Sequence, residues 1–186
     1  MKTITRNSAI NMFNVLGQIA LGQLNEEALD AALANLTACG KVQEDMNKLF
    51  EELNKRMYAG VAEERKEAFF ELVKKQEQTR ASINGLMKVE EAKKAIAEIK
   101  ELEEIMKNTY SDVYALYEKH SKAANKVATK EVEIDLVEVD ANEFIKAAIL
   151  GNKEIPVAEL RMFLAPMFKE EKQETDMSEL DELLAE

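Results

Sequence analysis

Apolar residues recur every three or four positions along most of the chain, a spacing typical of helices that bury one face. We expect a short strand at residues 2–5 and then four helices. Asn7 or Ser8 would cap the first helix, and Gly22 would end it. The helices are predicted at about 8–21, 25–58, 62–83 and 88–127.

The clearest pattern lies in the last of these helices. Positions taken every 3.5 residues from Val89 to Val127 are almost all apolar or aromatic. Such a stripe requires a helix packed along it, either the earlier helices folded back or a second copy of the chain in a homodimer. We expect the chain to reverse at Asn84-Gly85, a common turn dipeptide.

Beyond Lys130 the period changes from helical to alternating. Residues 131–136 alternate charged and apolar side chains, which predicts a strand that pairs with residues 2–5. Asp140 would cap a short helix over 141–150, and Pro156 would lie in the first turn of another that ends near Pro166. The fold class is therefore mainly α: long helical hairpins or a coiled-coil-like bundle with a minor two-stranded ribbon and short C-terminal helices.

Charge separates three regions. Residues 1–130 form a neutral helical body with 20 acidic and 20 basic side chains, whereas residues 131–186 hold 16 acidic and 5 basic ones. We expect 131–168 to contain the acidic strand and two short helices packed on it, and 169–186 to be a disordered acidic tail. This distribution disfavours direct binding to nucleic acid or to anionic membranes, both of which select basic surfaces.

Cys39 is the single cysteine, so neither an intrachain disulfide nor a cysteine-based zinc site is expected. Its apolar neighbours indicate a buried thiol. No stretch is long and apolar enough to span a bilayer, and residues 1–6 do not resemble a signal peptide. A cytoplasmic protein is expected.

No motif for a phosphate loop, dinucleotide or nucleophile is present, and no cofactor or metal is predicted. His120, the only histidine, lies on the long apolar stripe with Leu116 and Tyr117 one turn before it, where a metal site would need carboxylates. We expect His120 to be a packing residue. The chain is not expected to be an enzyme.

Three groups of side chains are candidates for contact with a partner protein. The tyrosines form an aromatic patch that serves either core packing or binding. The carboxylates could imitate a phosphate backbone if they share one surface, and otherwise provide solubility. The apolar residues near the end of the chain could enter a partner's groove. These candidates are Tyr110, Tyr114 and Tyr117; Glu131, Glu133, Asp135, Glu138, Asp140 and Glu143; and Leu180 and Leu183.

Three short stretches resemble small uncharacterised helical proteins encoded by tailed phages and prophages. They are residues 9–16 after the first strand, the acidic strand 131–136, and Ile155–Leu160 leading to residues 164–167. The resemblance covers about a fifth of the chain and implies a phage gene product, with no functional residues to transfer.

The sequence thus predicts a non-enzymatic protein that binds another protein of host or phage origin. With the resemblance, the expectation is a phage accessory protein that inhibits a host enzyme or defence factor. The alternatives are a structural or assembly component of a virion and an acidic mimic of nucleic acid.

Overall fold

The computed structural model describes residues 1–83, 88–151 and 155–169. Seven α-helices and one two-stranded sheet occur in this part of the chain, which confirms the predicted fold class. The Asn84-Gly85 turn, Leu180 and Leu183 lie outside the described residues.

The structure divides the chain into two compact units. The first combines residues 1–42 with the chain from Glu131 onward, and the second comprises Gln43–Lys130. This differs from the expected neutral body over 1–130, because the first 42 residues form one unit with the C-terminal elements. Charge composition could not reveal this partnership, which depends on contacts between distant segments.

The first unit begins with strand β1 (Lys2–Thr5), which pairs antiparallel with β2 (Glu131–Ile134). The ribbon was predicted, and the register sets Lys2 opposite Ile134 and Thr5 opposite Glu131. Helix α1 (Arg6–Gln18) follows at once. Its cap is Thr5, whose hydroxyl accepts a hydrogen bond from the Ser8 amide, so the predicted caps at Asn7 or Ser8 were wrong. The strand ends directly at the helix, which leaves no room for a later cap.

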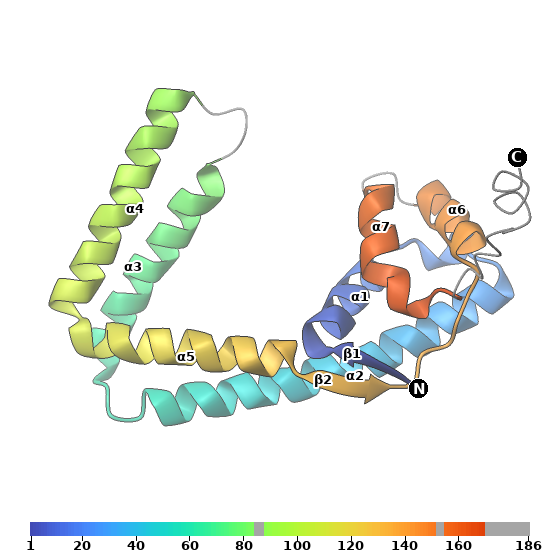
Figure 1. Ribbon diagram of the computed structural model, residues 1–186, viewed down its shortest axis with the longest axis horizontal. Coiled ribbons are helices and arrows are strands. Elements are labelled where there is room, and N and C mark those ends of the chain that lie inside the picture. Colours follow the sequence, from blue (N-terminus) through green and yellow to red (C-terminus); the bar gives the residue numbers. More distant parts are fainter. Residues whose placement is uncertain (84–87, 152–154, 170–186) are drawn as a thin grey trace, which may run out of the picture. The chain divides into compact units, whose positions relative to one another are not determined.

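The first unit is completed by the start of α2 (Glu26–Met57) and by two short helices, α6 (Ala141–Gly151) and α7 (Val157–Leu164) (Figure 1). A 3-10 turn, η1 (Leu21–Gln23), precedes α2, and another, η2 (Ala165–Met167), follows α7. The side chain of Asp140 accepts amide hydrogen bonds at the start of α6, as predicted, and Asn25, where the second helix was predicted to begin, does the same at the start of α2. Pro156 lies one residue before α7, as its cap.

The core of the first unit draws on both ends of the described chain. Helix α7 packs on α1, and α6 packs on η1 and α7. Buried apolar side chains from these elements enclose one polar residue, Asn35 on α2. The Asn35 amide donates to the Val137 carbonyl at 2.9 Å, and its oxygen accepts from the Val137 amide at 2.8 Å. One buried side chain therefore fixes the segment between β2 and α6.

The second unit contains the C-terminal part of α2 and the helices α3 (Glu63–Ser82), α4 (Val89–Thr109) and α5 (Ser111–Thr129). Helices α3 and α4 form a hairpin (Figure 1). On α4 the buried residues are Ala95, Leu102 and Met106, whereas Val89 and Ile96 are exposed. Helix α3 therefore covers the part of α4 that carries Ala95, Leu102 and Met106, and part of the predicted stripe stays exposed.

The predicted continuous helix over 88–127 was wrong. The chain leaves helical geometry at Tyr110, with φ −124° and ψ 38°, and this residue separates α4 from α5. The stripe continues across the break because the Tyr110 amide still bonds the Met106 carbonyl and the Tyr110 carbonyl accepts from the Tyr114 amide. Because the apolar periodicity continues across this one-residue break, the sequence pattern does not show where the helix is interrupted.

We predict that Asn35→Ala lowers the free energy of unfolding by about 1–3 kcal/mol, because the Val137 amide and carbonyl lose their partners. Asn47→Ala, at an exposed position of the same helix, should change it by less than about 0.5 kcal/mol. Urea unfolding followed by circular dichroism measures both values. Hydrogen exchange of the Val137 amide should also accelerate in Asn35→Ala alone, and equal behaviour of the two variants would contradict the assignment.

Candidate partner-binding site

The three candidate tyrosines surround one buried ring in the second unit. Phe69 on α3 is fully buried, and its ring centre lies 6.2 Å from that of Tyr110, 6.5 Å from Tyr114 and 5.5 Å from Tyr117. All three pairs meet edge to face, the arrangement that aromatic quadrupoles favour. The tyrosines therefore come together as the sequence suggested, and their first role is packing.

An arginine holds the junction between α4 and α5. The Arg65 guanidinium lies 5.0 Å from the centre of the Tyr110 ring. It donates to the Thr109 carbonyl at 2.9 Å and to the Asp112 carboxylate at 2.7 Å. The hydrogen bond from Arg65 lowers the pKa of Asp112. One cation thus binds the last carbonyl of α4 and the first turn of α5 together.

A concave pocket of about 310 Å³ opens beside the cluster, among α3, α4 and α5. Tyr114, Tyr117 and Met106 contribute its aromatic and apolar lining. Two cations, Arg80 from α3 and Lys122 from α5, line it from different helices. Two of the three predicted tyrosines therefore have a second surface that a partner's side chain can reach.

The carboxylate of Glu103 also lines this pocket and is hydrogen-bonded to neighbouring side chains. It accepts hydrogen bonds from Lys107 and, at 3.4 Å, from the Tyr114 hydroxyl. The hydrogen bond from Lys107 is the main reason why the pKa of Glu103 is lowered. Lys107 also lies 5.5 Å from the centre of the Tyr114 ring. These contacts fix the orientation of Tyr114. Besides its two cations, the pocket holds a second carboxylate, Glu118. The charge of Arg80 contributes to the lowered pKa of Glu103.

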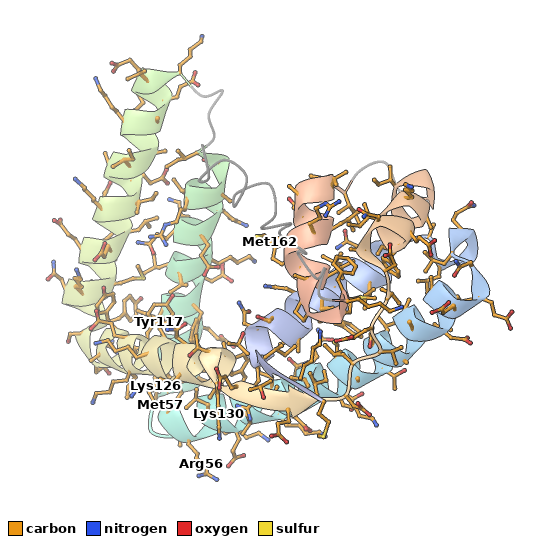
Figure 2. All side chains as sticks on the ribbon, turned by 45° about the vertical axis from the view of Figure 1, so that its right-hand side comes forward. Arg56, Met57, Tyr117, Lys126, Lys130 and Met162 are labelled. Carbon is orange, nitrogen blue, oxygen red and sulfur yellow. The ribbon has the colours of Figure 1, made fainter. Side chains whose placement is uncertain are left out.

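Lys122, which lines the pocket, also belongs to a row of basic residues along α5 and its C-cap residue, Lys130. Lys119, Lys122, Lys126 and Lys130 are all exposed and follow one another at intervals of three, four and four residues. At 3.6 residues per turn they fall within an arc of roughly 80°. None of the four makes an ion pair with another residue of the described ranges. In Figure 2, Tyr117 lies closer to the start of α5 than Lys126 and Lys130 do.

The charge totals of long regions did not reveal this basic face, because acidic residues elsewhere in residues 1–130 balance its lysines. Helix α5 carries only two carboxylates, Asp112 and Glu118, and Asp112 is bound by Arg65. Helical projection of the lysines in residues 119–130 would have found the face from the sequence. Arg80 could not have been placed beside it, because that proximity depends on how α3 packs.

The six candidate carboxylates lie in the first unit and have different roles. Glu131, Glu133 and Asp135 are exposed on or just after β2. Glu138 instead pairs with Lys2 at 2.7 Å, and this hydrogen bond lowers the pKa of its carboxyl group. Asp140 accepts the amides of Asn142 and Glu143 at 2.9 Å, as a helix cap.

Glu143 lies on α6, in the lining of a small cavity of about 100 Å³. All six carboxylates are exposed, but Asp135, Glu138 and Asp140 each have a partner within the chain, and Asp135 lies 3.8 Å from the Met1 ammonium. Imitation of a phosphate backbone would therefore have to use a set in which three members already have structural contacts.

Tyr58, just after α2, is a buried residue that sequence reasoning did not single out. It is 6 % exposed, and its ring lies 5.6 Å from Phe70 and 5.8 Å from His120. His120 thus packs against an aromatic ring, as predicted for a packing residue. Neither the Tyr58 hydroxyl nor His120 Nε2 has a hydrogen-bond partner among the described residues. Burial, with a smaller contribution from Tyr117, raises the pKa of Tyr58 to about 12.

Cys39 is fully buried in the first unit, as its neighbours indicated, and burial raises the pKa of its thiol to about 11. Over the described ranges there is no group of three or more His, Cys, Asp or Glu side chains placed to hold a metal ion. In the same part of the chain, no helix has both the length and the apolarity to cross a membrane.

No protein-family model, curated protein or solved structure matches this chain. Interpretation of the site therefore depends on its own geometry and chemistry.

We predict that alkaline titration resolves one tyrosine ionising near pH 12. Because folded Tyr58 retains a proton that the unfolded chain releases near pH 10, stability falls as pH rises from about 10 to 12. Absorbance of phenolate and urea unfolding at a series of pH values measure the two effects. Tyr58→Phe should remove the late step and reduce the loss of stability, whereas Tyr114→Phe should retain both. A Tyr58→Phe titration identical to that of the original chain would contradict this.

Proposed function

We propose that this chain is a non-enzymatic binding protein that docks an acidic segment of another protein on the second unit. The binding surface consists of the tyrosine-lined pocket and the adjoining basic face of α5. The observation that carries the proposal is the position of Lys122, which lines the pocket and belongs to the row of four exposed lysines.

The pocket and the lysines supply different parts of recognition. Tyrosine side chains often contribute strongly to the free energy of protein contacts, because they bury a large apolar area with few rotatable bonds, and methionine is enriched at interfaces. Exposed lysines contribute less affinity but accelerate association with an oppositely charged partner. A segment with one apolar or aromatic side chain in the pocket and carboxylates along α5 would use both features.

A protein partner is favoured over nucleic acid by the charge of the whole chain. Binding to a duplex requires several cations that displace counterions from the phosphates. Here one row of four lysines belongs to a chain with a net charge of −11, which would be repelled by the extended charge of a duplex.

A phage origin is part of the proposal and is supported by the resemblance of the three short stretches. In that setting the protein would act in the host cytoplasm, where capture of an acidic segment would block a host enzyme or defence factor. The partner surface to seek is therefore an acidic segment on a host protein.

The test begins with a photoreactive amino acid in place of Ser121, which lines the pocket. Proteins that cross-link in bacterial cells are identified by mass spectrometry, and the leading one is purified for affinity measurements. We expect Lys122→Glu with Lys126→Glu to weaken binding by roughly tenfold, about 1.4 kcal/mol, because two attractions become repulsions. Added salt should also weaken binding of the original chain.

The matched control is Lys94→Glu with Lys100→Glu, which makes the same charge change at exposed positions of α4. It should leave the affinity unchanged. Equal loss in both double variants would indicate a general charge effect and contradict the assigned surface. Cross-linking to nucleic acid in place of protein would contradict the proposed class of partner.

A further inference from the structure

The first unit contains a groove that is separate from the surface described above. It has a volume of about 640 Å³ and is lined by β1 from Lys2 to Ile4 and by residues of α7 and η2. Ile4, Pro166 and Phe168 give it an apolar part. A groove of this size can accept several apolar side chains.

Three cations line the same groove: Lys2, Arg161 and Lys169. Lys2 forms an ion pair with Glu138, whereas Arg161 donates a hydrogen bond to the neutral side chain of Asn142 at 3.0 Å. Lys169 makes no direct ion pair inside the described ranges. In the more acidic part of the chain, this groove therefore combines apolar surface with positive charge. That combination fits an acidic amphipathic segment.

We propose that residues 170–186 of the same chain occupy this groove. This segment contains eight acidic residues and one basic residue. Its apolar residues Met177, Leu180, Leu183 and Leu184 recur at the spacing of one helical face. In the bound arrangement these four side chains lie on the apolar part of the groove, and neighbouring carboxylates face Lys2, Arg161 and Lys169.

The connection to the groove favours occupation within one chain over exchange with a second copy. The Lys169 amide donates to the Val139 carbonyl at 2.9 Å, so the segment starts from an anchored residue that itself lines the groove. From Lys169 to Met177 the chain can extend to about 27 Å, at roughly 3.4 Å per residue. A connection this short gives an effective concentration on the order of millimolar, which a second copy in dilute solution does not reach.

The proposal is tested by zero-length carbodiimide cross-linking of the full chain at low concentration, with products mapped by mass spectrometry. The reporter amine is Lys2, because it lines the groove and is far from residues 170–186 in sequence. We expect a cross-link from Lys2 to Glu179, Asp181 or Glu182 in the monomer fraction. The ion pair between Lys2 and Glu138 provides an internal control for reactivity.

Leu180→Asp with Leu183→Asp should reduce the yield of this cross-link by about tenfold or more, because the apolar contact is lost. Ala185→Asp adds a carboxylate to a different helical face and should preserve it. In both variants the Lys2–Glu138 cross-link should persist, which shows that the first unit remains folded. The proposal is overturned if Lys2 joins only Glu138, or if its link to residues 179–182 appears only in a dimer fraction.

Discussion

The burial of Phe69 among three tyrosines is the interaction on which the second unit depends. Helix α3 begins at Glu63, and Arg65 in its first turn reaches the end of α4. If α4 continued straight beyond Thr109, Val113 and Tyr117 would pass the start of α3 and lose contact with its apolar face. The break at Tyr110 instead brings α5 back against Phe69, so aromatic burial favours a bent chain over a longer helix.

The same packing creates the proposed binding surface. Edge-to-face contacts hold one side of Tyr114 and Tyr117 against Phe69, and their remaining surface lines the pocket. The break also sets the direction of α5, and therefore the row of lysines that leads from the pocket. Packing and recognition use different faces of the same tyrosines, so their identity alone could not distinguish the two roles.

The first unit depends on a different kind of constraint. Its core unites the opening 42 residues with segments that follow Glu131, and the ribbon from β1 to β2 joins these distant parts. Asn35 then fixes the chain after β2 by pairing with both backbone groups of Val137. A fully buried amide is costly unless all its polar atoms are paired, so these two hydrogen bonds make one path of the 135–139 segment strongly preferred.

Local signals in the sequence were sufficient for most elements. Alternation at residues 131–134 predicted β2, and Asn25 and Asp140 marked helix starts, because caps act within one turn. Features that depend on distant contacts were not predictable: the break at Tyr110, the central position of Phe69 and the pairing of Asn35 with Val137. At the candidate site the tyrosine patch was predicted. The basic face was not predicted, because the net charge of residues 1–130 is zero. The position of Arg80 in the pocket depends on how α3 packs and could not be predicted either.

Nuclear Overhauser spectra of chain labelled selectively at Phe and Tyr test this account most directly. The account predicts contacts from the Phe69 ring to Tyr110, Tyr114 and Tyr117, with non-helical chemical shifts confined to Tyr110 between α4 and α5. Helical shifts that continue unbroken through Tyr110, without contacts from Phe69 to Tyr114 and Tyr117, would contradict it. That outcome would remove both the bend and the pocket on which the proposed function depends.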